Sequence, residues 1–260
     1  MALIALASAK GAPGVTTAAL ALAMVWPRSV LLVEADLAGT SVMPGYYRAL
    51  VPHDRGLHQL AIAHSHGDLT DRELWDQTMA LDQTDTQRAF LPGILKPRSA
   101  ASLRDLWGPL ASHLAALEAG GVDVIVDLGR IQAREDREPL LTVADLVLLT
   151  TSSRLPDVVM TQAIAADRVS SSTRAVTNLA LLVVGPGRPY TEQQIAKHVG
   201  LTSVGTLAWD QVSAQVLSVG TRPTGQFTKS PLMRTATTVA DQIGQHITQR
   251  RDQLDTKEPR

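Results

Sequence analysis

The sequence predicts one α/β domain built on a doubly wound, mostly parallel sheet that is flanked by helices. Two observations predict this class: short apolar runs without polar alternation, and helical stripes between them. Uninterrupted apolarity is typical of strands buried on both faces of a parallel sheet, and alternation of such strands with helices indicates right-handed crossovers. The runs, rich in Val, Ile and Leu, span residues 3–7, 30–33, 122–126, 146–149 and 179–184.

The predicted helices carry their own boundary signals. A stripe of apolar residues at spacings of three and four runs over 103–117 and is stopped by Gly120 and the glycine after it. Thr191 and Gln194 form a capping-box pattern that opens a further helix. A last helix is expected over about 232–249. We therefore expect one domain over residues 1–250 and a disordered, polar tail over residues 251–260.

Composition limits the classes of partner. The 260 residues include 24 basic and 25 acidic side chains, so the formal net charge is −1. Such a balance gives no global field that would attract nucleic acid or an anionic membrane, and it favours protein partners. No apolar stretch approaches the roughly 18 residues of a membrane span, so stable membrane insertion is not expected. The absence of cysteine excludes disulfides and favours a reducing, cytoplasmic location.

The most informative segment is a glycine-rich loop over Ser8–Thr17, between a predicted strand and a predicted helix. In that position, backbone N–H groups and the helix N-terminus bind phosphates. Gly14 and Thr16 match the ordinary phosphate-loop pattern, but Val15 occupies the place of its lysine. The ordinary pattern alone therefore does not match.

This loop resembles the deviant Walker A motif of the ParA/MinD family of ATPases, which adds an early signature lysine. The matching residues are Lys10, Gly11, Gly14, Thr16 and Thr17, and the departures are Ala12, Pro13 and Val15. The resemblance implies a P-loop NTPase-like fold, bound ATP with Mg²⁺, and a nucleotide-sandwiched homodimer. In that dimer Lys10 would reach the phosphates bound by the partner. Pro13 lacks an N–H, so one phosphate donor is missing.

Two acidic strand ends extend the resemblance. Asp36, shortly after the apolar run at 30–33, matches the residue that orients the attacking water, and Glu34 replaces an aspartate of that motif. Asp127 ends a strand that is similar to Walker B and matches its metal-linked carboxylate. One carboxylate at a strand end, together with the Thr16 hydroxyl, is a donor set suited to Mg²⁺.

The resemblance thus implies a complete site. Lys10 and Asp36 are the implied catalytic residues, and Thr16, Asp127 and Glu34 the implied metal site. Asp210 lies in a segment similar to the one near the family's adenine site. The implied nucleotide-binding residues are Lys10, Gly11, Ala12, Pro13, Gly14, Val15, Thr16, Thr17 and Asp210.

Within the family, Asp-Leu-Gly-Arg at 127–130 and Leu-Pro at 155–156 resemble the CpaE/TadZ branch, whose members position pilus assembly machinery. The leading hypothesis is a cytoplasmic, nucleotide-dependent dimeric switch that positions a cellular machine for pilus or secretion assembly, division or partitioning. Because Val15 replaces the phosphate-binding lysine, the sequence is compatible both with slow Mg-dependent hydrolysis of ATP and with loss of hydrolysis. The alternatives are an inactive pseudo-ATPase scaffold that works by protein contacts, and a DNA-partitioning ATPase.

Overall fold

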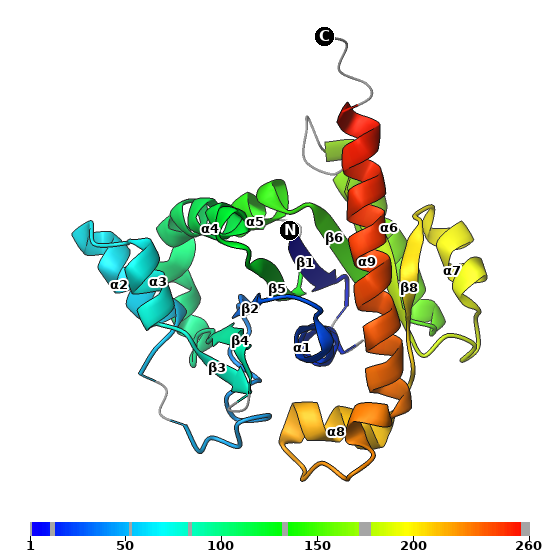
Figure 1. Ribbon diagram of the computed structural model, residues 1–260. Helices are drawn as coiled ribbons and strands as arrows, with labels where there is room; N and C mark the ends of the chain where they lie inside the picture. The colour runs from blue at the N-terminus through cyan, green and yellow to red at the C-terminus, as the bar shows by residue number, and fades with distance from the viewer. Residues whose placement is uncertain are drawn as a thin grey trace.

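The computed structural model describes residues 2–10, 14–51, 54–82, 85–131, 135–171 and 178–255 (Figure 1). Within them, one eight-stranded sheet has the strand order β3-β4-β2-β5-β1-β6-β7-β8. Only β3 is antiparallel to its neighbour; the other adjacent pairs are parallel. The strands are β1 (Leu3–Ser8), β2 (Val30–Glu34), β3 (Met79–Asp82), β4 (Asp85–Leu91), β5 (Asp123–Arg130), β6 (Leu146–Ser152), β7 (Leu179–Val184) and β8 (Ser203–Leu207).

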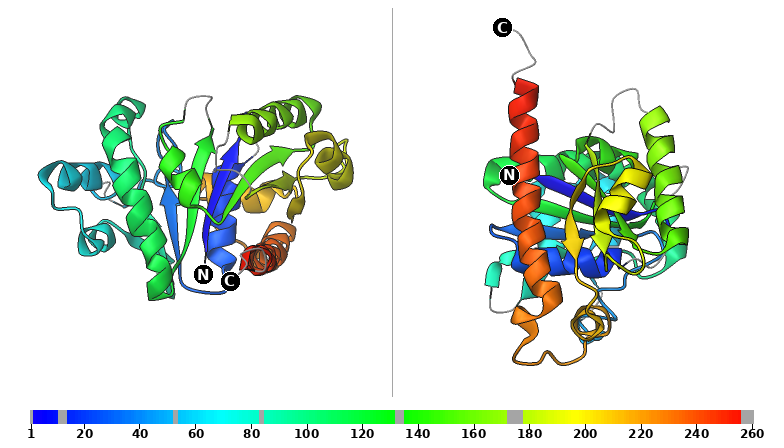
Figure 2. Two further views of the ribbon diagram at one scale, coloured as in Figure 1. Left: turned by 90° about the horizontal axis from the view of Figure 1, so that it is seen from above. Right: turned by 90° about the vertical axis from the view of Figure 1, so that its right-hand side faces the viewer.

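Helices cover both faces of this sheet, as the view from above in Figure 2 shows. One apolar core lies between the sheet and α1, α8 and α9, and a second lies on the opposite face under α2 to α7. The helices are α1 (Val15–Val25), α2 (Leu57–His66), α3 (Asp71–Asp76), α4 (Trp107–Ala116), α5 (Glu138–Val143), α6 (Leu155–Ser171), α7 (Glu192–Val199), α8 (Gln211–Val219) and α9 (Pro231–Asp255). Short 3₁₀ segments add Pro97–Leu106, Leu117–Gly120 and Phe227–Lys229.

The predicted fold class is confirmed: this is a doubly wound α/β domain whose mostly parallel sheet is covered by helices on both faces. Each of the five apolar runs forms a strand that is buried on both faces. The capping box is present, with Thr191 accepting from the Gln194 N–H and the Gln194 side chain accepting from the Thr191 N–H. The helical stretch that was expected to stop at Gly120 ends as predicted, with Gly121 in the left-handed conformation at φ 82° after Leu117–Gly120.

The C-terminal boundary differs from the expected one. α9 continues to Asp255, six residues past the predicted end, so residues 251–255 are helical and not part of a tail. Arg251 gives the physical reason, because its guanidinium pairs with Glu118 at 2.9 Å and with Asp145 at 2.6 Å. These ion pairs attach the end of the helix to the amino edge of the sheet. Among the described residues, no helix is both long enough and apolar enough to cross a membrane.

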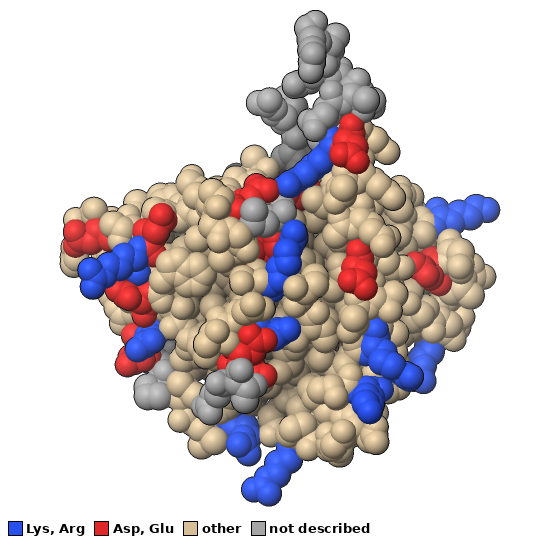
Figure 3. All heavy atoms as spheres, viewed as in Figure 1, with Lys and Arg blue, Asp and Glu red and all other residues tan. Residues whose placement is uncertain are grey.

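Acidic and basic side chains are both spread over the molecular face in Figure 3. That mixture agrees with the near-zero net charge of the whole chain.

Candidate functional site

The carboxyl end of β1 and the start of α1 form one side of the candidate site. Gly14 is the N-cap of α1 and has a φ of 83°, in the left-handed region that glycine adopts without strain. The first helical hydrogen bond runs from the Ala18 N–H to the Gly14 carbonyl at 2.8 Å. The N–H groups of the three residues between them belong to the first turn of α1, the end of a helix at which N–H groups bind anions.

Of the remaining loop residues predicted to bind nucleotide, Lys10 is exposed, and Thr16 and Thr17 are half-buried. Within the part of the chain that the structure describes, Lys10 makes no hydrogen bond or ion pair. Gly11, Ala12 and Pro13 lie outside the described residues. The Lys10 ammonium is thus free to contact an anion brought from outside.

Val15 is the first residue of α1 and is only 6% exposed. Its side chain belongs to the apolar core on the α1 face of the sheet, together with residues of β1 and α1. A side chain at this position is directed into the core. Val15 thus contributes its backbone N–H to the loop, while its isopropyl group stabilises the packing of α1.

Asp127 lies near the carboxyl end of β5, next to β1, and is 1% exposed. Its Oδ1 accepts the Gly129 N–H at 2.8 Å, whereas its buried Oδ2 has no hydrogen-bond partner among the described residues. Burial raises the pKa of the carboxyl to about 7, with the negative charges of Glu34 and Asp36 acting in the same direction. The Thr16 hydroxyl and the Gly129 N–H lower this pKa, but by less.

Asp36 follows β2, the strand on the other side of β5. Its Oδ1 accepts the Ala38 N–H at 2.8 Å. Its carboxylate lies against Gly129, since a Cβ built on that glycine would come within 2.1 Å of Asp36 Oδ2. Burial raises the pKa of Asp36, and the Ala38 N–H and, to a smaller extent, the Arg137 guanidinium partly offset this effect. Gly129, with a φ of +57°, therefore leaves the space that the Asp36 carboxylate fills.

Glu34 is opposite Asp127 in the register of β2 and β5. Its carboxylate is 1% exposed and accepts hydrogen bonds from the Thr40 hydroxyl and from the backbone N–H groups of Ser41, Val42 and Gly93. Burial raises its pKa despite these donors. Its observed contacts stabilise the segment after β2 and join it to the end of β4. A role of Glu34 in metal binding stays a prediction.

Asp210 and its neighbours lie at the far side of this edge, after β8. Asp210 is the N-cap of α8, accepting the Ser213 N–H at 3.1 Å, and it also accepts the Leu232 N–H at 3.5 Å. The adjacent Trp209 is 48% exposed and its indole lies against Gly185, the residue that follows β7. The observed Asp210 contacts are internal, so its predicted role in nucleotide binding stays a prediction.

Sequence reasoning missed Arg137, a residue with no exposed surface directly behind the acidic strand ends. It forms a bidentate ion pair with Glu135, with Nε to Oε1 at 2.6 Å and Nη2 to Oε2 at 2.8 Å. In sequence, it belongs to a run of alternating charges that is typical of an exposed loop, and no local pattern indicates burial.

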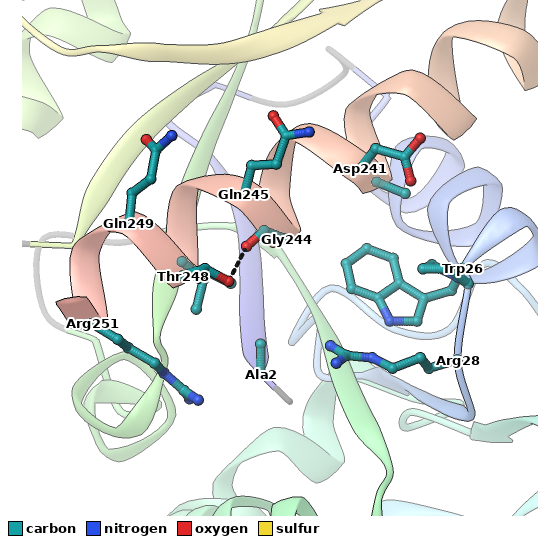
Figure 4. A pocket seen from close by; sticks show the side chains of 12 residues that line it. Ala2, Trp26, Arg28, Asp241, Gly244, Gln245, Thr248, Gln249 and Arg251 are labelled. Carbon is teal, nitrogen blue, oxygen red and sulfur yellow. Dashed lines mark hydrogen bonds between the residues drawn. The ribbon is translucent and has the colours of Figure 1, made fainter.

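A separate cavity of about 730 Å³ lies at the amino ends of the strands (Figure 4). It is lined by α9, the start of β1 and the segment after α1, including Trp26, Arg28 and Arg251. Both arginines are already paired with carboxylates, Arg28 with Asp123 at 2.7 Å. The predicted site residues lie at the opposite, carboxyl edge of the sheet, so this cavity is not the candidate site.

The donor set at the carboxyl edge fits Mg²⁺. A buried carboxylate oxygen without a partner costs free energy, and the cost is removed by a cation or by protonation. Asp127 Oδ2 is such an atom, and the Thr16 hydroxyl beside this carboxyl supplies a second oxygen of the type that Mg²⁺ prefers.

Comparison with known proteins agrees with this architecture. No protein-family model and no curated protein matches the sequence. Among solved structures, similar folds belong to ParA/MinD family ATPases. A ParA family ATPase from Chlorobium tepidum TLS superposes with a TM-score of 0.73 at 15% identity, covering 92% of this chain and 98% of that one.

Two further structures with a similar fold are complexes with nucleotides. The septum site-determining protein MinD of Pyrococcus horikoshii OT3, complexed with Mg-ADP, has a TM-score of 0.69 at 16% identity, covering 93% of this chain and 95% of that one. An ATP complex of a McdA variant from Cyanothece has a TM-score of 0.67 at 13% identity, with 94% and 96% covered. At these identities the likeness establishes the fold.

The unpartnered Asp127 carboxyl predicts a pH-dependent effect of Asp127→Asn on the metal-free protein. Because the folded-state pKa is raised above the unfolded value, this group favours folding at low pH, and its contribution is lost as the pH rises from about 4 to 7. The variant has no charge to bury, so at pH 8 its free energy of unfolding should exceed that of the wild type by about 2–4 kcal/mol. The gain should disappear near pH 4.

Asp123→Asn is the matched control, at the other end of the same strand. Asp123 is equally buried but accepts hydrogen bonds from the Ala2 N–H, the Trp26 indole and Arg28. This variant should lose roughly 2–4 kcal/mol at pH 8. Urea unfolding at several pH values measures both. If Asp127→Asn raises the free energy of unfolding equally at every pH, or lowers it at pH 8, the buried Asp127 carboxyl does not have the raised pKa described above.

Proposed function

We propose that the chain is a ParA/MinD-like nucleotide switch that binds ATP with Mg²⁺ at the carboxyl edge of its sheet. The observation that carries the proposal is the buried, unpartnered Asp127 Oδ2, close to the Thr16 hydroxyl and to the N-terminus of α1. A phosphate-binding helix end and a carboxylate that lacks a cation are the two halves of a metal–nucleotide site. The fold of the solved ATPases supports the same assignment.

In this proposal each residue has a role set by its place. The N–H groups at the start of α1 bind phosphate oxygens, and the helix dipole adds to their effect. Thr16 and Asp127 hold the metal, with Glu34 behind them as the remaining acidic candidate. Bound Mg²⁺ would neutralise charge on the phosphates. Lys10 is exposed, so its ammonium reaches anions outside its own loop.

Asp36 is the residue that we assign to orienting a water molecule. Its Oδ1 is held by the Ala38 N–H, and only part of the side chain is buried, so the carboxylate remains able to accept from water. The positive charge at the phosphates would be lower than in an ordinary phosphate loop, because the apolar Val15 occupies the place of that motif's lysine. Hydrolysis is therefore expected to be slow.

The biological role that we infer is a dimeric switch that positions a cellular machine, of the kind associated with the CpaE/TadZ branch. Two subunits would meet face to face around the nucleotides, with Lys10 contacting the phosphates of the opposite subunit. Nucleotide state would then select which surface binds a protein partner, because a ligand shifts populations only through unequal affinity for two conformations.

One observation favours a second candidate, a pseudo-ATPase scaffold that acts by protein contacts alone. Val15 is packed into the apolar core, so the residue that replaces the phosphate-binding lysine contributes to the stability of the fold. In a scaffold of this type the acidic strand ends would be remnants of a catalytic site.

Calorimetric titration distinguishes these candidates. We expect ATP to bind the wild type with Mg²⁺ at micromolar to submillimolar Kd, and Asp127→Asn to weaken binding by about tenfold with Mg²⁺ but much less without it. Asp123→Asn is the control for indirect effects on β5 and should bind as the wild type does at a temperature where it is folded. Absence of ATP binding at millimolar concentration would exclude the switch and leave the scaffold.

Lys10→Ala tests the dimer. Because Lys10 is exposed and forms no hydrogen bond or ion pair with the described residues, its removal should leave the melting temperature within about 1 °C of the wild-type value. ATP-dependent dimerisation, measured by light scattering, should fall by about tenfold in affinity, together with any ATP turnover.

Lys197→Ala, an equally exposed lysine on α7, is the matched control and should leave both properties unchanged. If Lys10→Ala dimerises with ATP as the wild type does, the bridging role of Lys10 is wrong.

A further inference from the structure

The Arg137 guanidinium is surrounded by backbone carbonyls from two neighbouring strand ends. Nη1 donates to the Ala35 carbonyl at 2.9 Å and also to that of Leu128, and Nη2 donates to the Arg130 carbonyl at 3.0 Å. The remaining donors are taken by Glu135, whose side chain is 1% exposed. The cation is thus fully buried and fully paired.

These carbonyls belong to the residues that flank the acidic groups. Ala35 directly precedes Asp36 at the end of β2, and Leu128 directly follows Asp127 in β5. Leu128 and Arg130 also enclose Gly129, whose N–H binds Asp127 Oδ1 and whose Cα faces the Asp36 carboxylate. One guanidinium therefore fixes the backbone next to both aspartates, while no atom of Arg137 forms a hydrogen bond with either carboxylate.

The chemistry of the pair points to positioning rather than to stability alone. A buried ion pair contributes little net stability compared with apolar residues of the same volume, because both charges lose hydration. What a guanidinium adds is a rigid fork with donors in fixed directions, and a lysine ammonium does not reproduce it. Here the fork joins the end of β5 to the residue after β2, and Arg137 itself is the N-cap of α5.

We propose that Arg137, held by Glu135, is a positioning residue that fixes Asp36 and the Asp127–Gly129 segment of β5 relative to each other for metal–nucleotide binding. This inference rests on the proposed function for the identity of the ligand, but its geometric part concerns the free protein. Two backbone amides report that geometry directly: Ala38 N–H, which binds Asp36 Oδ1, and Gly129 N–H, which binds Asp127 Oδ1.

The test uses a double variant, Glu135→Leu with Arg137→Met, which removes both charges together and leaves neither one buried alone. Arg137→Lys is the second variant, which keeps the charge but not the fork. The control double variant, Glu138→Leu with Arg168→Met, removes the neighbouring ion pair between α5 and α6. Circular dichroism and thermal unfolding establish that each variant is folded.

Hydrogen exchange in the nucleotide-free protein is the first readout. In the double variant and in Arg137→Lys, the Ala38 and Gly129 amides should exchange at least about tenfold faster than in the wild type, while the amides of β1 keep their protection. The control should leave both amides unchanged. Unaltered exchange at Ala38 and Gly129, or an equal acceleration throughout the sheet, would overturn the positioning role.

The second readout is the factor by which Mg²⁺ increases ATP affinity. This factor should fall by about tenfold in both Arg137 variants, while ATP affinity without Mg²⁺ stays within about twofold. Equal losses with and without Mg²⁺ would instead indicate general damage to the site and would contradict the proposal. If the wild type itself binds no ATP, the proposed function fails, and the exchange measurement alone decides the geometric role of Arg137.

Discussion

A carboxylate at the end of a central strand has one buried oxygen that accepts no hydrogen bond from the described residues. Asp127 is buried between β1 and β2, and the raised pKa of its carboxyl expresses the cost of ionising it there. The nearby groups are of the kinds that a metal–nucleotide site uses: the helix N-terminus after Gly14, the Thr16 hydroxyl, and the Asp36 carboxylate against Gly129. Binding of a cation is the change that would stabilise all of them together.

The two ends of β5 show how the same residue type serves different purposes. Asp123, at the amino end, is saturated by a backbone N–H, an indole and an arginine, and it stabilises the base of the sheet. Asp127, at the carboxyl end, retains an unused acceptor. Structural carboxylates are satisfied within the protein, while those of a binding site are completed by the ligand. Parallel strands gather the second kind at one edge, where α/β folds bind ligands.

The sequence was sufficient for the fold class and for the central strands, because uninterrupted apolar runs leave few alternatives. It did not indicate β3, β4 or β8, which are short or lie at and near the sheet edges, where burial is weaker and apolar patterning is diluted. The final helix ran longer than predicted because Arg251 finds acidic partners far away in the sequence. Long-range ion pairs of this kind leave no local pattern.

The same reasoning applies to the candidate site. Motifs that follow or end the predicted strands indicated Lys10, Asp36 and Asp127 as candidate site residues. That Glu34 accepts hydrogen bonds from residues 40–42 and 93, and that Arg137 is buried behind the aspartates, depends on where the chain returns in space. Charged residues in a polar run are expected on the surface, so only tertiary structure reveals such a pair.

The most direct test of the account is to locate a metal in crystals grown with Mn²⁺ and a non-hydrolysable ATP analogue. Anomalous scattering identifies the position of Mn²⁺ independently of the phosphates. The account predicts one strong peak at the carboxyl edge, bound by the Thr16 hydroxyl and adjacent to Asp127, with phosphates at the start of α1. A nucleotide bound elsewhere, such as the cavity lined by Arg28 and Arg251, or a metal distant from Asp127, would contradict it.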